Sequence, residues 1–123
     1  MRVRPERVAH LMRREIAEII GSRLRDPRLS HWVSVTDVEV TGDLSLARVY
    51  VSILPTGEER ERSLRALERA AGYVRHELAP RLGLREVPEI RFLLDPSIEQ
   101  GARVEELLRK LNRGEPVEGE EGV

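Results

Sequence analysis

A long helical pattern that contains a glycine dominates the middle of this chain. Apolar side chains recur there at steps of three and four residues, at Leu64, Leu67, Ala71, Val74 and Leu78. This spacing is typical of a helix that buries one face against another layer. Gly72 lies inside the pattern, within Ala70-Ala71-Gly72, although glycine in a helix interior costs about 1 kcal/mol relative to alanine. We therefore expect a kink that divides the segment into two helical halves.

The sequence leaves two interpretations of Ala70-Ala71-Gly72 open. Small side chains allow another helix or strand to pack closely against the segment, and the segment by itself favours this structural interpretation. The second interpretation uses the guanidinium groups of Arg69 and Arg75, which flank the small residues. A kink between two arginines would receive a phosphate backbone, because guanidinium groups bind phosphate oxygens in a bidentate manner.

Two more helices are expected, one on each side of this segment. The first begins at Pro5, whose missing N–H costs nothing in a first turn, and it runs for about 20 residues with one apolar face. It ends before Asp26-Pro27, because proline disfavours helix in the residue that precedes it. The middle helix is expected to start after a Thr56 cap and to stop at Gly83. Residues 97–112 form the final helix, with leucines on its apolar side.

Alternating valine-rich segments predict strands. Residues 33–40 change phase near Thr36-Asp37, which predicts a β-bulge. The turn signal Thr41-Gly42-Asp43 joins this strand to residues 44–54 as a hairpin. A further strand, residues 89–94, follows the middle helix and places its alternate apolar side chains on one face.

The order of these elements predicts an α+β domain. It reads helix, strand, strand, helix, kink, helix, strand, followed by a C-terminal helix, and the helices are expected to cover one face of a three-stranded sheet. A chain of 123 residues has room for one such domain with a single core. We expect residues 1–112 to form it and residues 113–123 to be an acidic, disordered tail. The pattern does not determine the strand order.

Charge is distributed unevenly, although the net charge is −1. Residues 1–32 contain eight arginines and four acidic residues, whereas residues 115–123 contain four glutamates and no basic residue. The basic N-terminal part, residues 1–32, predicts a polyanionic partner. The chain has no cysteine, and it has no apolar run long enough for a signal peptide or a membrane span. We therefore expect a soluble, cytoplasmic protein.

No motif in the sequence predicts catalysis. The three histidines lie in different elements without neighbours at metal-ligand spacing, and no serine or glycine-rich loop has a catalytic or phosphate-binding context. We expect no enzymatic activity, no metal and no cofactor. Aromatic residues are 3% of the chain, which argues against a sheet that stacks nucleic-acid bases. Trp32 is interpreted as a lid over the sheet edge or as an interface anchor, and the lid is favoured.

Several segments, in a fixed order, carry a family resemblance. They are RPERVA at residues 4–9, DPRL at 26–29, VTDV at 35–38 followed by DL at 43–44 and ARVYVS at 47–52, AAG at 70–72, and FLLDPSI at 92–98 with Gly101 beyond. On these segments the chain resembles the ribosome-binding factor A family, which are bacterial small-subunit assembly factors. The resemblance covers about residues 2–112 and leaves the acidic tail unmatched. The single lysine, Lys110, also departs from the family, whose members often have more.

The resemblance implies a fold and a function. The fold is the type II KH fold, in which the kink Ala70-Ala71-Gly72 replaces the Gly-x-x-Gly nucleic-acid loop of other KH domains. The function is binding to the free small (30S) ribosomal subunit late in assembly, with assistance to 5′-end maturation of 16S rRNA and support of growth in the cold. A ribosome-associated GTPase takes part in release of family members. The factor is not itself an enzyme, and we expect it to act as a monomer.

These implications and the arginine positions together predict an RNA-binding surface that recognises the shape of folded rRNA. The expected RNA-binding residues are Arg7, Arg14, Arg25, Arg28, Arg48, Arg69, Ala70, Ala71, Gly72 and Arg75. Two alternatives remain. One is a protein-interaction adaptor that uses the first helix and Trp32, with RNA binding incidental. The other is a small hydrolase that processes the RNA directly.

Overall fold

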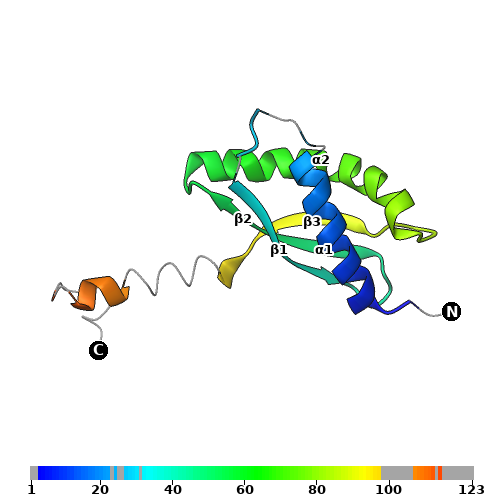
Figure 1. The fold of residues 1–123 in the computed structure, drawn as a ribbon, viewed down its shortest axis with the longest axis horizontal. Coiled ribbons are helices and arrows are strands. Elements are labelled where there is room, and N and C mark those ends of the chain that lie inside the picture. Colours follow the sequence, from blue (N-terminus) through cyan, green and yellow to red (C-terminus); the bar gives the residue numbers. More distant parts are fainter. Residues whose placement is uncertain are drawn as a thin grey trace.

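The fold is organised around a central strand that pairs with a neighbour on each side. The computed structural model describes residues 3–22, 24, 27–30, 32–97, 107–112 and 114. The elements in chain order are α1 (Pro5–Ser22), β1 (Trp32–Val40), β2 (Leu46–Leu54), α2 (Glu58–Leu82) and β3 (Glu89–Leu94) (Figure 1). Residues 107–112 form a further helical segment. This order confirms the α+β class expected from the sequence.

The sheet has the order β1-β2-β3, which the sequence left open. β1 and β2 pair antiparallel, whereas β2 and β3 pair in parallel, from Leu46 opposite Glu89 to Val51 opposite Leu94. Parallel neighbours require a crossover connection, and α2 provides it. With α1 ahead of the hairpin, the arrangement is the type II KH-like fold.

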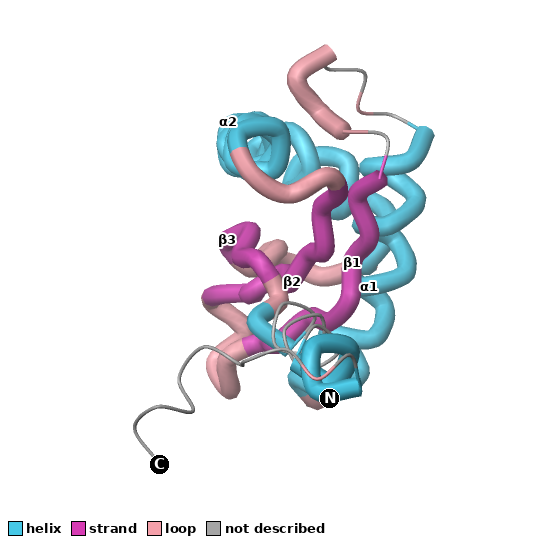
Figure 2. Tube along the Cα trace, turned by 90° about the vertical axis from the view of Figure 1, so that its left-hand side faces the viewer, coloured by secondary structure: helices cyan, strands magenta, loops and turns pink. Residues whose placement is uncertain are grey.

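Both long helices cover the same face of the sheet, and Figure 2 shows α1 beside β1 with α2 over the other two strands. Alternate side chains of β2 point under the helices, and Ala47, Val49 and Val51 are fully buried there. The remaining side chains of β2, among them Arg48 and Tyr50, point the other way. The helices supply the matching apolar layer, which is Val8, Met12, Ile16 and Ile19 of α1 with Leu67, Val74 and Leu78 of α2.

The predicted bulge is present in β1. The pairing register with β2 shifts between Val35 and Asp37, so Thr36 is the extra residue. Because side chains alternate across a strand, one added residue restores the inward phase of the second half of β1. The valines on both sides of the bulge therefore pack on the same core, at Val33, Val35, Val38 and Val40.

Helix α2 is continuous through Ala70-Ala71-Gly72, so the two expected halves are one helix. In Figure 1, α1 passes in front of α2, and α2 changes direction beyond this crossing. The helix is not interrupted there. Pro80 lies in its last turns, and a proline there removes one backbone hydrogen bond. The helix stops at Gly83, which adopts the left-handed conformation at φ 65°, as expected.

Three local expectations are wrong. The residue before α2 is Gly57, at φ 87° and without a side-chain cap, and not a Thr56 cap. The second strand begins at Leu46, because residues 42–45 form a turn in which Leu44 has φ 62°. Trp32 is not a lid, because 71% of its surface is exposed.

Other expectations fall partly or wholly outside the described residues. The first helix ends at Ser22, and Asp26 is not among the residues described. Only residues 107–112 of the expected final helix are described as a helix beyond Ser97. The acidic tail from Glu115 onward lies outside the described residues, so its predicted disorder stays a prediction.

A buried pair of serines ties the loop after α1 to α2 and to the sheet. The Ser63 hydroxyl of α2 is fully buried; it accepts a hydrogen bond from the Ser30 N–H at 2.9 Å and donates one to the Arg28 carbonyl at 3.3 Å. The Ser30 hydroxyl in turn donates to the Leu54 carbonyl and accepts from the Trp32 N–H. These bonds hold the start of β1 and the end of β2 beneath the first turns of α2.

Replacement of Ser63 by alanine should lower the free energy of unfolding by about 1–3 kcal/mol, because the Ser30 N–H would be left buried and without its acceptor. Urea denaturation measures the change. The matched control is Ser34→Ala in β1, where the side chain is exposed and the expected change is within about 0.5 kcal/mol. Equal stabilities of the two variants would contradict this role of Ser63.

Candidate nucleic-acid interface

The outward side of α2 carries three arginines followed by Gly72 and a histidine. Positions 62, 65, 69, 72 and 76 step by three and four residues, so they share the face of the helix opposite its buried stripe. All five are exposed, namely Arg62, Arg65, Arg69, Gly72 and His76. We call these five residues the α2 row. It extends along the helix for about 21 Å at the usual rise per residue.

Gly72 is exposed, and none of the described elements packs against it. A Cβ placed on Gly72 would meet no atom within 4 Å among the described parts of the chain, beyond its neighbours and its own helix. The interpretation that another helix or strand packs closely on Gly72 is therefore wrong. The helix backbone at this point is accessible to an external ligand.

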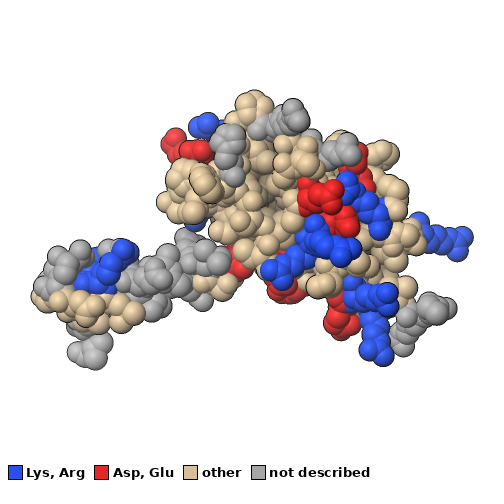
Figure 3. All heavy atoms as spheres, viewed as in Figure 1, with Lys and Arg blue, Asp and Glu red and all other residues tan. Residues whose placement is uncertain are grey.

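The outward side of α1 carries a second, shorter basic row. Arg7, His10 and Arg14 follow each other at steps of three and four residues, and all three are exposed. We call them the α1 row. Figure 3 shows basic side chains gathered over α1 on this face of the molecule, with acidic side chains between them. Arg14 lies 3.6 Å from the Glu15 carboxylate, yet 71% of its side chain remains exposed, so it stays available to a ligand.

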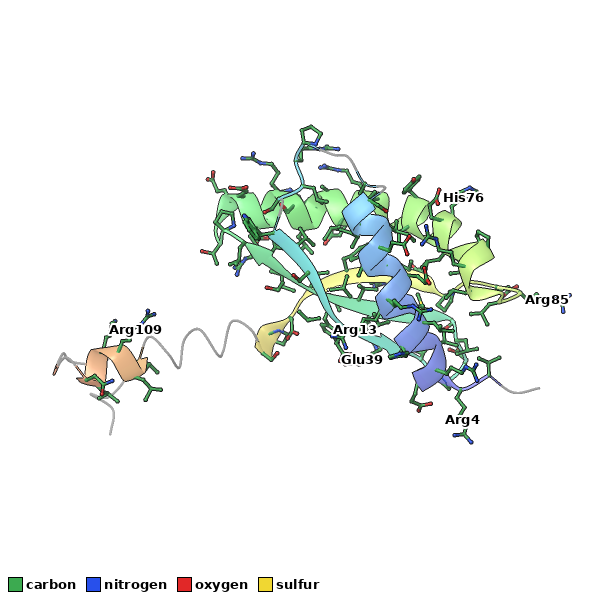
Figure 4. All side chains as sticks on the ribbon, viewed as in Figure 1. Arg4, Arg13, Glu39, His76, Arg85 and Arg109 are labelled. Atoms are coloured by element: carbon green, nitrogen blue, oxygen red, sulfur yellow. The ribbon has the colours of Figure 1, made fainter. Side chains whose placement is uncertain are left out.

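A shallow groove separates α1 from the second half of β1. Its walls carry charges of both signs, with Arg13 and Glu6 on the helix and Asp37 and Glu39 on the strand. Figure 4 shows Arg13 and Glu39 near each other, where α1 passes β1. Because the carboxylates offset the guanidinium, this groove is a poor site for a phosphate.

Arg81 joins the two helices to each other. Its guanidinium lies 2.9 Å from the Glu15 carboxylate and 3.2 Å from that of Glu18, both on α1. The hydrogen bond to Glu15 raises the pKa of Arg81 above its ordinary value. Arg81 therefore has a structural role. It fixes the position of the α1 row relative to the α2 row.

Arg75, one of the expected RNA-binding residues, is exposed, but its guanidinium is bonded within the protein. Its Nε and Nη2 atoms donate to the Val87 carbonyl at 3.0 and 2.6 Å. This carbonyl belongs to the segment that leads into β3, so Arg75 fastens α2 to the loop that follows it. We assign Arg75 a structural role, in contrast to Arg69, which points outward from the same helix.

The remaining expected residues lie in four different settings. Ala70 and Ala71 are half-buried, and Ala71 packs against the core. Arg28 is exposed in the loop after α1, where its carbonyl accepts from Ser63. Arg48 is on the open face of the sheet, opposite the helices, so it joins neither row. Arg25 lies outside the described residues.

Sequence reasoning missed Arg62 and Arg65. Arg65 lies about one helical turn before Arg69, and Arg62 lies about two turns before it. These steps of three and four residues are the same periodicity that identified the buried stripe. The same periodicity, applied to the polar side, would have found the α2 row. The sequence analysis instead selected arginines that flank Gly72 in the sequence, and it therefore selected Arg75.

The open face of the sheet is mixed in charge. Arg48 pairs in register with Glu39 on β1 and Arg91 on β3, and Tyr50 pairs with Asp37. Loss of hydration, followed by the nearby Glu39 carboxylate, raises the pKa of Tyr50 above its ordinary value of 10.0. This face therefore carries carboxylates in the positions that a phosphate backbone would approach.

The described residues contain no group of three histidine or carboxylate side chains placed to hold a metal ion. In the same part of the chain, no helix combines the length and the apolar character that a membrane span requires.

Comparison with known proteins gives a consistent result. The family described as Ribosome-binding factor A matches residues 4–108. The chain is similar to the ribosome-binding factor A of Caldanaerobacter subterraneus subsp. tengcongensis, with 45% identity over 115 residues, which cover 94% of each protein. It is similar to that of Macrococcus caseolyticus, with 46% identity over 113 residues, which cover 92% of this chain and 98% of the relative.

Solved structures agree with the fold. The crystal structure of ribosome-binding factor A from Thermus thermophilus matches with a TM-score of 0.66 and 34% identity, covering 73% of this chain and 93% of that one. A homology model of the Thermus thermophilus factor, fitted into the cryo-EM map of its complex with the 30S subunit, matches with a TM-score of 0.57 and 36% identity. That match covers 70% of this chain and 92% of the other.

The raised pKa of Tyr50 gives a test of the charge on the open face. Glu39→Gln should lower the pKa of Tyr50 toward 10.0, because the neighbouring negative charge is removed. The measurement is an absorbance titration of the phenol in a Tyr73→Phe background, which leaves one tyrosine. Since the folded state holds the phenol protonated, folding stability should fall as pH rises from 10 through the higher folded-state pKa.

The matched control for this titration is Glu89→Gln, at the start of β3 on the same sheet. This carboxylate is not among the groups that shift Tyr50, so the pKa of Tyr50 should not change. If Glu39→Gln left the pKa of Tyr50 where it was, the assigned cause would be wrong.

Proposed function

This chain belongs to the ribosome-binding factor A family, and from that premise we propose that it binds the small ribosomal subunit with the outward sides of its two helices. The observation that carries the proposal is the α2 row, in which exposed arginines lead to Gly72, and a Cβ placed there would meet no atom within 4 Å in the part of the chain that the structure describes. Such a surface admits a phosphate backbone to the helix and surrounds it with guanidinium groups. The related factor of Thermus thermophilus, fitted into a map of its 30S complex, supports the choice of partner.

The mode of binding follows from the residues of the two rows. Arg62, Arg65 and Arg69 neutralise phosphates along α2, and Arg7 and Arg14 do so along α1. The side chains of both rows project from helices that Arg81 holds together, so the surface meets RNA as a rigid body. A rigid surface whose contacts are mainly guanidinium groups recognises the shape of folded rRNA more than the edges of its bases.

The consequence for assembly is a shift in the population of rRNA conformations. By binding one arrangement of the maturing rRNA, the protein would favour it over others. We propose that this assists late maturation of the 30S subunit and processing of the 5′ end of 16S rRNA, including during growth in the cold. The protein would act in the cytoplasm as a monomer and by binding alone, with RNA cleavage left to other enzymes and with a ribosome-associated GTPase in its release.

The arginines of the α2 row are tested by a triple variant, Arg62→Gln, Arg65→Gln and Arg69→Gln. We expect weaker binding to purified free small subunits, and a log affinity against log salt plot whose slope decreases in magnitude by about 2 to 3, since each lost phosphate contact removes about 0.7–0.9. Co-sedimentation at several salt concentrations measures both quantities. The fold should persist, because these side chains are exposed.

The control for the triple variant is Arg48→Gln with Arg91→Gln, which removes positive charge from the open face of the sheet. This double variant should bind free subunits with nearly unchanged affinity. An equal loss in the control would mean that only net charge matters. Binding that resists salt in the wild-type protein would favour the adaptor alternative, because an apolar contact is little screened by salt.

Gly72 is tested by substitution with valine. We expect stability to be kept or slightly raised, because valine is a better helix former than glycine by a few tenths of a kcal/mol and its Cβ would enter space that is open among the described residues. We expect binding to free subunits to weaken, because the added side chain occupies the space that the phosphate backbone would enter. Thermal unfolding and co-sedimentation on the same samples separate the two effects.

Gly72→Ala provides the graded comparison, since its side chain is smaller and its gain in helix stability is larger, at about 1 kcal/mol. Its binding should lie between those of the wild-type protein and of Gly72→Val. If Gly72→Val bound free subunits as tightly as the wild-type protein, RNA would not approach the helix at this position.

A further inference from the structure

An apolar corner stands exposed at one end of the sheet. Trp32 at the start of β1 pairs in register with Leu54 at the end of β2. The exposed fractions of these side chains are 71% and 54%. We call this pair the apolar corner. It lies on the open face of the sheet, the face that also carries Arg48 and Tyr50, so neither α1 nor α2 covers it.

The chemistry of this corner suits an apolar ligand more than a phosphate. The next pair in register toward the middle of the sheet is Ser34 with Ser52, and the pair beyond the bulge brings the Asp37 carboxylate beside Tyr50. A phosphate that approached the corner would meet this negative charge before it met a guanidinium of the same face. An apolar side chain would instead remove the exposed surfaces of Trp32 and Leu54 from water.

A second exposed apolar surface occurs on the C-terminal helical segment. Residues 107–112 place Leu107, Leu108 and Leu111 on one side of a short helix. Leu108 is 54% exposed and Leu111 is 53% exposed. Figure 1 shows this segment beyond the end of β3 and away from the sheet. Two exposed apolar surfaces on one chain are each a candidate partner for the other.

The topology makes the chain leave the sheet at the end that carries the apolar corner. β3 runs parallel to β2 and ends with Leu94 opposite Val51, so the chain leaves the sheet at the same end that carries Leu54. Leu54 lies three residues beyond Val51, which is about 10 Å along a strand. The stretch of chain between Ser97 and Leu107 can span up to about 30 Å, which is long enough for the leucines to reach the corner.

We propose that the helical segment of residues 107–112 docks on the apolar corner of its own chain, with Leu108 and Leu111 against Trp32 and Leu54. The tether keeps the two surfaces at a high effective concentration, so a small contact suffices where free partners would need a large one. The docked segment covers one end of the open face. It leaves the α1 row and the α2 row uncovered, and it does not depend on the proposed function.

The experiment uses Trp32, the one tryptophan of the chain, as its reporter. In the full-length protein, Leu108→Ser with Leu111→Ser should shift the emission of Trp32 to longer wavelength and increase its quenching by acrylamide, because the indole returns to water. The matched control is Arg109→Gln with Lys110→Gln, on the other side of the same helical turn, which should leave both readings unchanged. Circular dichroism verifies that the fold persists in each variant.

A cross-link gives an independent measurement, since the chain has no cysteine of its own. Ser52→Cys with Leu107→Cys should form a disulfide within one chain under mild oxidation, at a yield that does not vary with protein concentration. Identical Trp32 emission in the wild-type protein and in the leucine double variant would overturn the proposal. A cross-link only between chains, or Trp32 emission that changes on dilution, would also overturn it, because the occupant would then be a second copy.

Discussion

Burial of alternate side chains of β2 beneath two helices determines which sides of those helices face solvent. Ala47, Val49 and Val51 are fully buried, and they require an apolar layer on one side of the sheet only. Helices α1 and α2 supply that layer, each with one apolar stripe turned inward. Each helix must then turn its polar side outward, so the position of the basic rows is a consequence of how the core packs.

The arginines of this protein divide into those that hold the fold and those that face outward. Arg81 connects α2 to two carboxylates of α1, and Arg75 is bonded to the carbonyl of Val87. The α2 row keeps its guanidinium groups exposed, and Gly72, next after Arg69 in the row, leaves the helix backbone open. A net charge of −1 does not reveal this division, because it averages basic helix surfaces with acidic segments elsewhere. Local placement therefore matters more than total charge for binding to a polyanion.

The sequence predicted those features of the fold that local periodicity encodes. The third strand was expected at residues 89–94 and is found there, and the phase change near Thr36 indicated the bulge correctly. The end of α2 at Gly83 was also predicted, because few residues other than glycine adopt its left-handed conformation. The start of α2 was not, since the choice between Thr56 and Gly57 depends on the backbone path out of β2.

The candidate site was predictable only in part, because its geometry depends on distant packing. Whether Gly72 lies under another element depends on how α2 sits on the sheet, and the sequence left both interpretations open. The destination of the Arg75 guanidinium is a carbonyl twelve residues away, which no spacing rule indicates. Helical periodicity on the polar side of α2 indicates Arg62 and Arg65. They were not predicted, because the arginines of α2 were selected by their proximity to Gly72 in the sequence. The exposure of Trp32 follows from the absence of a covering helix on that face among the described residues.

The central claim is that the outward sides of α1 and α2 bind ribosomal phosphates. The salt dependence of binding between the full chain and purified free small subunits tests it most directly. With five to six phosphates contacted, the logarithm of the association constant should fall against the logarithm of salt concentration with a slope of about −4 to −5. A slope near zero would contradict the claim, because contact with phosphates must release counterions.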